Sequence, residues 1–184
     1  MAPLPGNPPP RPVNVRLRPL AVADLPTLYE HQCDAEAAAM AVVTPRTREE
    51  FDAHWDRLLN QPPPGLVARA IEADGELVGS VNCFQRPGLP EEGATVNAAG
   101  EVEGELDFVG YRIARAHWGR GIATRALAAL LAEVHVRPLR SRVASTNVAS
   151  LRVLERCGFI ITGRRDAPAE GRFPACEEVH LRLG

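Results

Sequence analysis

Residues 117 to 124 have the sequence His117-Trp118-Gly119-Arg120-Gly121-Ile122-Ala123-Thr124, and they join a predicted strand (residues 105–113) to a predicted helix that begins near Ile122. Gly119 and Gly121 lack a Cβ, so the backbone can turn tightly and bring several N–H groups to one point. The unpaired N–H groups of the first helical turn face the same point, and the helix dipole adds partial positive charge there. The stretch therefore predicts a binding site for a phosphate or pyrophosphate.

Two common phosphate-binding loops do not fit this stretch. A nucleoside-triphosphate loop ends in Gly-Lys-Ser or Gly-Lys-Thr, and this chain has no lysine, since all 21 of its Lys+Arg residues are arginine. A dinucleotide-binding turn needs glycine or alanine at its sixth position, where this chain has Thr124. That turn also normally opens its domain, whereas this stretch lies well into the second half of the chain.

A third kind of loop does fit. Trp118-x-x-Gly121-x-Ala123 resembles the [Gln/Arg]-x-x-Gly-x-[Gly/Ala] signature of the GNAT acyltransferase superfamily, which binds the pyrophosphate of acetyl-coenzyme A. Residues 111–127 are most similar to the branch that includes the ribosomal-protein-alanine N-acetyltransferases, where Trp commonly replaces the leading Gln or Arg. A second segment, Asn147 to Phe159, is similar to the family's N-x-x-S…GF segment. The resemblance covers roughly residues 14–183.

The periodicity of the sequence predicts strands and helices in an order that matches the GNAT arrangement. Thr47-x-x-Glu50 is a capping box, and Asp74-Gly75 is a strong hairpin signal. We expect strands at 13–20, 66–73, 76–84, 105–113, 141–145, 159–162 and 177–183, helices at 24–33 (capped by Asp24), 47–60, 122–134 and 147–157, and a loop without regular structure at 86–104. The resemblance implies an α/β (α+β) GNAT fold: a central mixed, mostly antiparallel twisted sheet of about six to seven strands with helices on both faces.

Length and composition favour one cytoplasmic domain. We expect residues 1–12 to be a disordered, proline-rich lead and residues 13–184 to be a single domain. The net charge of −2 argues against a nucleic-acid partner. No apolar run reaches the roughly 18 residues of a membrane span, and the N-terminus does not resemble a signal peptide. The four cysteines and five histidines show no metal-ligand spacing, so we expect no metal.

The resemblance implies that acetyl-CoA is the co-substrate and assigns residues to it. In the family, the asparagine of the second segment contacts the pantetheine arm, and the serine or a nearby tyrosine lies near the sulfur as proton donor; the matching serine here is Ser150. The alternative is that Asn147 only caps its helix and that Ser150 is a neighbour of that cap. The expected cofactor-binding residues are Ile113, Trp118, Gly119, Arg120, Gly121, Ile122, Ala123, Thr124, Asn147 and Ser150.

The general base is harder to assign. Related enzymes often use a glutamate on the strand before the phosphate loop, and Glu105 and Asp107 alternate there, facing one side of the strand. They are candidate catalytic residues together with Ser150, although a solvated edge of charges explains them as well. The glutamate that some branch members carry just after Gly-Phe is absent, since residues 160–163 are Ile-Ile-Thr-Gly. Acidic residues in and beside the 86–104 loop would form a negative lip for cationic amines, or a solvated insertion.

The sequence thus predicts an N-acetyltransferase that moves an acetyl group from acetyl-CoA to a primary amine by direct attack in a ternary complex. The acceptor is a protein N-terminus or a small-molecule amine, and a homodimer is possible. A non-catalytic acyl-CoA-binding module is the first alternative, because a candidate base is missing. The second is a dinucleotide-dependent enzyme that uses the same loop.

Overall fold

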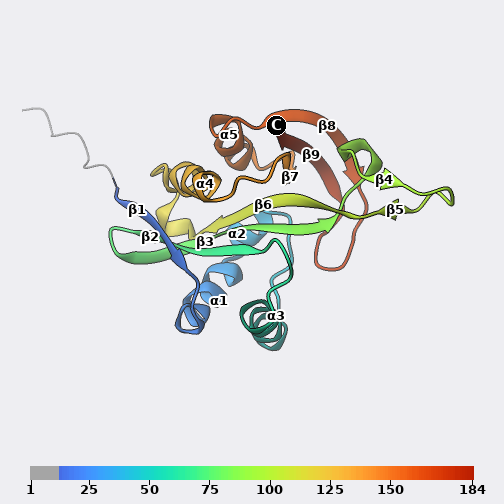
Figure 1. Cartoon of the computed structure of the whole chain (residues 1–184). Helices are drawn as coiled ribbons and strands as arrows, with labels where there is room; N and C mark the ends of the chain where they lie inside the picture. The colour runs from blue at the N-terminus through green and yellow to red at the C-terminus, as the bar shows by residue number, and fades with distance from the viewer. Residues whose placement is uncertain (1–12) are drawn as a thin grey trace, which may run out of the picture.

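The computed structural model describes residues 13–184, so the predicted proline-rich lead (1–12) lies outside the described residues. A seven-stranded sheet forms its centre, with the strand order β1-β2-β3-β6-β7-β9-β8 (Figure 1). Its strands are β1 (Val15–Pro19), β2 (Val67–Ala73), β3 (Glu76–Pro87), β6 (Glu105–Ile113), β7 (Leu139–Ala144), β8 (Ile160–Ala167) and β9 (Cys176–Leu183). Helices cover both faces, as the GNAT resemblance implies.

The helices divide between the two faces of the sheet. One face carries α4 (Ile122–Glu133) and α5 (Val148–Arg156), and the other carries α1 (Leu25–Cys33), α2 (Ala35–Met40) and α3 (Arg48–Asn60). The sequence did not predict α2, although Asp34 and the alanine-rich run after it are a helix-start signal: the Asp34 carboxylate accepts a hydrogen bond from Ala37 N. The capping box of α3 is confirmed, because Thr47 and Glu50 each bond the other's backbone N–H.

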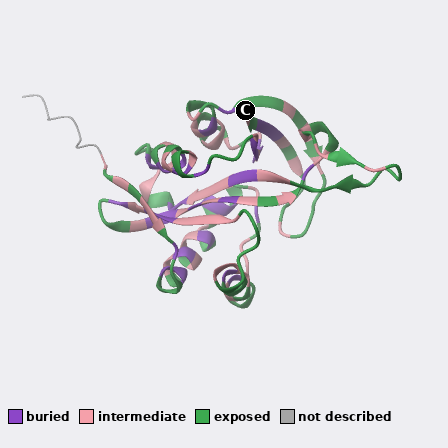
Figure 2. Cartoon of the chain, viewed as in Figure 1, coloured by how far each residue is buried: buried purple, intermediate pink, exposed green. Residues whose placement is uncertain are grey.

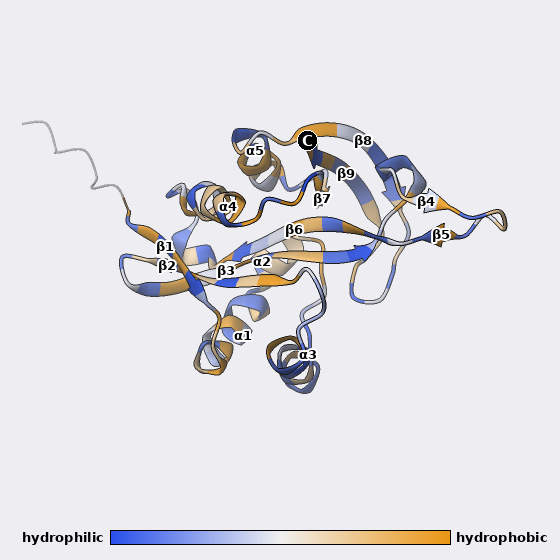
Figure 3. Cartoon of the chain, in the orientation of Figure 1, coloured by the Kyte–Doolittle hydropathy of each residue, from blue (hydrophilic) through white to orange (hydrophobic). Residues whose placement is uncertain are grey.

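The main core lies between the sheet and α4. Leu127 and Leu130 of α4 are fully buried against Ile71 and Val81 of the sheet, and each such side chain contributes about 1.5–3 kcal/mol by leaving water. Figures 2 and 3 show the buried and the hydrophobic residues gathered along the middle of the sheet and on the helix faces turned toward it. A smaller cluster, which includes Phe51, packs α3 against α1.

The predicted hairpin is confirmed and the predicted loop is partly corrected. Asp74 and Gly75 both have positive φ, 54° and 88°, as a type I′ turn requires. The segment after β3, expected to lack regular structure, contains η2 (Pro90–Glu92) and a ribbon of β4 (Thr95–Val96) and β5 (Val102–Glu103). Glu92 is buried here and bonds Arg142 of β7, so this acid is neutralised rather than part of a negative lip.

Parallel pairing occurs once among the described strands, between β6 and β7, and it is short. Its register contains the single pair Phe108↔Arg140, whereas β3 and β6 pair from Gly79↔Ile113 to Pro87↔Glu105. The two central strands therefore diverge toward the carboxyl end of β6. The sheet is mixed and mostly antiparallel, as expected, and this divergence opens it near the predicted phosphate loop.

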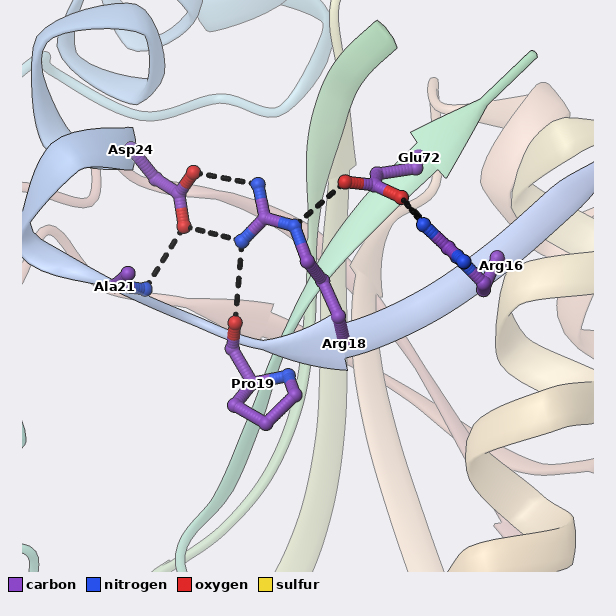
Figure 4. Close-up of polar contacts among 6 residues, drawn as sticks. All are labelled: Arg16, Arg18, Pro19, Ala21, Asp24 and Glu72. Atoms are coloured by element: carbon purple, nitrogen blue, oxygen red, sulfur yellow. Dashed lines mark hydrogen bonds and ion pairs between the residues drawn. The ribbon is translucent and has the colours of Figure 1, made fainter. Parts of the chain in front are cut away.

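Asp24 does not cap its helix as the sequence predicts. Its carboxylate accepts two hydrogen bonds from the Arg18 guanidinium (2.6 and 2.7 Å) and one from Ala21 N (2.8 Å) (Figure 4). Arg18 also donates to Glu72 of β2 (2.6 Å). Arg18 thus ties the start of α1 to the first two strands, and the Asp24 oxygens that would cap the helix are already engaged.

We predict that Asp24→Asn lowers the free energy of unfolding by about 2 kcal/mol at pH 7, because it breaks a largely buried, charge-assisted pair. The Arg18 hydrogen bonds hold the pKa of Asp24 below its ordinary value. The carboxylate therefore stabilises the fold above the unfolded pKa of about 3.9 and loses this effect as the pH falls through the folded pKa.

Urea unfolding followed by circular dichroism at pH 7 and pH 3 measures this difference. The matched control is Asp52→Asn, which removes an exposed i,i+4 pair with Arg48 and costs at most about 0.5 kcal/mol. An Asp24→Asn effect that is the same at both pH values would contradict the ionic explanation.

Candidate active site

The loop between β6 and α4 has the conformation that anion binding requires. Gly119 and Gly121 have φ of 73° and 70°, and Gly121 is the N-cap of α4. Within residues 13–184, no protein acceptor takes a hydrogen bond from the backbone N–H groups of Gly119 to Thr124, and the first bond of the helix runs from Arg125 N to Gly121 O (3.2 Å). These N–H groups are free to bind an anion at the positive end of α4.

A cleft of about 390 Å³ begins at this loop. It runs from the first turn of α4, past Tyr111 and Ser150, to α2 on the other face of the sheet. The Thr124 hydroxyl is buried on its wall, with no hydrogen-bond partner among the described residues. A buried hydroxyl normally has a partner, so the wall is polar where a ligand would complete its hydrogen bonding.

Two arginines hold or flank the loop, but their side chains do not line the cleft. Arg125 donates to the carbonyls of Arg120 (2.6 Å) and Gly121 (3.3 Å). Because these carbonyls point toward the Arg125 guanidinium, the N–H groups of the loop point away from it. The Arg120 guanidinium bonds His117 (3.0 Å) and Asp74 (3.4 Å). Of the predicted cofactor residues in the loop, Arg120 therefore does not line the cleft, and Arg125 acts by shaping the loop.

The remaining predicted residues of the loop do line the cleft. They are Ile113, Trp118, Gly119, Gly121, Ile122, Ala123 and Thr124. The indole of Trp118 donates to Ile113 O (2.8 Å) and so fastens the loop to the end of β6. Sequence reasoning missed Arg152 and Arg156 of α5, which also line the cleft; their i,i+4 spacing, which puts them on one helix face, was the available signal.

Asn147 and Ser150 begin α5 at the other side of the cleft. Asn147 Oδ1 accepts a hydrogen bond from Ser150 N (3.1 Å) and so caps the helix. Its amide nitrogen has no hydrogen-bond partner within the described part of the chain and remains able to donate to a ligand. Capping and ligand contact are therefore compatible.

The Ser150 hydroxyl lies 2.8 Å from the Tyr111 hydroxyl. Burial raises the pKa of Tyr111 to about 12, with the Ser150 hydrogen bond opposing that shift in part. Tyr111 therefore stays protonated at neutral pH. The sequence analysis did not predict that Tyr111 contacts Ser150. The available signal was the alternation of side chains along β6, which puts Tyr111 on the same face of the sheet as Ile113.

Glu105 and Asp107 are not brought to this site. They lie at the opposite end of β6, which spans about 26 Å between Glu105 and Ile113 at about 3.3 Å per residue. Asp107 instead accepts a hydrogen bond from Gln85 (3.0 Å). Among residues 13–184, no aspartate or glutamate lines the cleft, so its walls carry positive and neutral groups.

The edge of β6 that faces the cleft carries unpaired backbone groups. Val109 O accepts from Ser141 of β7 (3.3 Å), whereas Ala114 N donates to Val78 of β3 (2.8 Å). Because backbone groups alternate between the two edges of a strand, the N–H groups of Tyr111 and Ile113 point into the gap between β6 and β7. They are placed to stabilise negative charge on an oxygen held there.

A sequence profile described as "Acetyltransferase (GNAT) domain" matches residues 14–160. The chain belongs to the GNAT family. It is therefore an N-acetyltransferase, and the predicted family and enzyme class are confirmed. A search of curated proteins gave no match.

Solved structures share this GNAT fold over most of both chains. An N-acetyltransferase from Staphylococcus aureus Mu50 is 19% identical with a TM-score of 0.70, covering 92% of this chain and 98% of that one. A Vibrio cholerae spermidine N-acetyltransferase in complex with CoA and spermine is 15% identical with a TM-score of 0.70, covering 92% and 94%. RimL, a ribosomal L7/L12 alpha-N-protein acetyltransferase in complex with CoA, is 16% identical with a TM-score of 0.68, covering 92% and 93%.

Among residues 13–184, no group of three or more His, Cys, Asp or Glu residues is placed to hold a metal ion. No helix in residues 13–184 has both the length and the apolar character that crossing a bilayer needs.

We predict that Gly121→Asp weakens CoA binding by at least about tenfold, equivalent to about 1.4 kcal/mol. The new carboxylate would repel a diphosphate, and its Cβ would lie 3.3 Å from the Arg125 guanidinium. Isothermal titration calorimetry with CoA measures the affinity.

Gly100→Asp is the matched control, because Gly100 also has positive φ (83°), lies in the β4–β5 connection and has open space around its Cβ position. Both variants carry similar backbone strain, of about 1–2 kcal/mol. If both lost CoA binding equally, strain rather than the loop would explain the result.

Proposed function

We propose that this protein transfers the acetyl group of acetyl-CoA to a primary amine in the cytoplasm, by direct attack of the amine in a ternary complex. The observation that carries the proposal is the convergence, in one cleft, of the free N–H groups at residues 119–124 with the Tyr111–Ser150 hydroxyl pair. The CoA complexes of the spermidine acetyltransferase and RimL support the choice of co-substrate. The acceptor is a small-molecule amine or a protein N-terminus.

The residues at one end of the cleft would hold the co-substrate. The N–H groups of Gly119 to Thr124 bind its diphosphate, and Arg152 and Arg156 add positive charge beside it. The Asn147 amide donates to the pantetheine arm. These groups fit a long anionic ligand, because donors and cations follow one another along the cleft and no carboxylate opposes them.

The residues at the gap between β6 and β7 would act on the reacting centre. Bound acetyl-CoA supplies an acetyl group activated as a thioester. The N–H groups of Tyr111 and Ile113 stabilise the thioester oxygen as it gains negative charge. As the nitrogen–carbon bond forms and the carbon–sulfur bond breaks, the Ser150–Tyr111 pair donates a proton to the departing sulfur.

The amine loses its proton to solvent in this proposal, rather than to Glu105 or Asp107. Neither acid lines the cleft, and the Arg112 guanidinium on its wall disfavours a second positive charge nearby, which lowers the pKa of a bound ammonium group. The neutral amine is therefore the form that the cleft favours, and neutral amine is the form that attacks.

The direct test is release of free CoA from acetyl-CoA in the presence of a panel of amines. We expect turnover with at least one amine and none in its absence. Tight binding of acetyl-CoA without turnover on any amine would favour the non-catalytic module instead. Thermal stabilisation by NAD(P) but not by CoA would favour a dinucleotide enzyme.

We predict that Ser150→Ala lowers kcat by about 100-fold, the low end of the roughly 10²–10⁴-fold that general acid catalysis contributes, while changing the Kd for CoA by less than about threefold. Tyr111→Phe should lower kcat in the same way, and the double variant should lose much less than the product of the two effects, because the hydroxyls act as one unit. Steady-state CoA release and calorimetry measure the two quantities. Unchanged turnover in Ser150→Ala would remove Ser150 from the reaction.

A further inference from the structure

Three arginines from distant parts of the sequence lie close enough to one another for their charges to interact, and one of them, Arg112, lines the cleft. They are Arg46, before α3, Arg112 of β6, and Arg172, between β8 and β9. Arg112 follows Tyr111 on β6, so its side chain leaves the opposite face of the sheet. There it lines the same cleft together with Ala37 and Met40 of α2. It therefore stands beyond the reacting gap from the bound CoA, where the acceptor enters.

Neither Arg46 nor Arg172 lines the cleft, but hydrogen bonds fix the segments that carry them. Thr44 N donates to Arg172 O (2.8 Å), and Arg172 Nε donates back to Thr44 O (3.0 Å). The buried side chain of Gln32 bonds both backbone groups of Arg46, donating to its carbonyl (3.1 Å) and accepting from its N–H (3.4 Å). The two hydrogen bonds between Thr44 and Arg172 thus join the β8–β9 connection to the segment between α2 and α3.

The three guanidinium groups have no counter-ion in the part of the chain that the structure describes. All three residues are half-buried, yet none of them forms an ion pair. Glu50 is the acid that acts on Arg46 and Arg172, but its carboxylate is engaged by Thr47 N (2.9 Å) in the capping box of α3.

Unpaired charges of one sign are costly when water is partly excluded. Burial, together with the charges of Arg46 and Arg112, lowers the pKa of Arg172 to about 10. Burial and the nearby arginines Arg46, Arg57 and Arg172 likewise lower the pKa of His54 to about 4. The positive field is therefore strong across this side of the cleft, and an anion that bound there would relieve the repulsion.

We propose that the acceptor is a small amine that also carries a carboxylate or phosphate group, that Arg112 binds this anion, and that Arg46 and Arg172 add positive charge near it. The proposal rests on the proposed function and specifies its acceptor. The anionic group would orient the amine of the same molecule toward the gap between β6 and β7. Its negative charge would also offset the positive field that would otherwise repel a cationic amine. A polyamine carries only positive charge and would be repelled.

The size of the cleft favours a small acceptor over a peptide. The cleft volume of about 390 Å³ is near the lower end of the range for small-molecule sites.

Matched amines test the anion requirement. We expect kcat/KM for β-alanine to exceed that for propylamine, and kcat/KM for phosphoethanolamine to exceed that for ethanolamine, by at least about tenfold. Whichever of the two acidic amines is preferred identifies the anion, carboxylate or phosphate, that the site binds. Arg112→Met should abolish this preference, Arg112→Lys should retain part of it, and Arg164→Met, at an exposed arginine of β8 that pairs with Glu177, should leave it intact. The Kd for CoA should stay the same in all three variants.

Equal or faster turnover of the uncharged partners, of spermine, or of a peptide N-terminus would overturn the proposal. A second readout does not depend on turnover. Inorganic phosphate, titrated at constant ionic strength into the CoA-saturated protein, should raise the Tm of the wild type and not that of Arg112→Met or Arg172→Met. A Tm increase with phosphate but no turnover on any amine would retain the anion site while contradicting the proposed function. If phosphate did not raise the Tm and the acidic amines were not preferred, the anion site itself would be contradicted.

Discussion

The divergence of β6 and β7 after their single pair, Phe108↔Arg140, is the constraint on which the site depends. A buried strand edge with unpaired N–H groups is normally unfavourable. Here that edge faces a cleft, where the N–H groups of Tyr111 and Ile113 can serve a ligand. The opening between the strands also lets one cleft reach both faces of the sheet.

Contacts on both sides of the gap keep it open. On one side, the Tyr111 ring packs against the core beneath α4 and α5, and its hydroxyl meets Ser150. At the paired end, the Phe108 ring stacks on Phe84 and lies under the Arg142 guanidinium. Arg142 is in turn fixed by buried Glu92 of the 87–104 insertion. This insertion, which the sequence indicated only as an acidic loop, therefore anchors the closed end of the two strands.

Net charge is a poor guide to the charge that a substrate meets in this protein. The whole chain carries −2, and its acidic residues suggested a lip that attracts cations. In the folded chain, Asp24 and Glu92 are paired with Arg18 and Arg142, and no acid among the described residues reaches the cleft. What remains on the walls is positive, because Arg112 of β6 and Arg152 and Arg156 of α5 line the cleft.

The sequence by itself determined the phosphate loop, the capping box of α3, the Asp74-Gly75 turn and the GNAT assignment, because each depends on residues that are near neighbours along the chain. Only the tertiary structure decided that Tyr111 contacts Ser150, that the Asp24 carboxylate bonds Arg18 rather than capping its helix, and that Glu105 and Asp107 do not line the cleft. Such contacts join residues from separate strands and helices, and strand register and helix packing, which set them, are properties of the whole sheet.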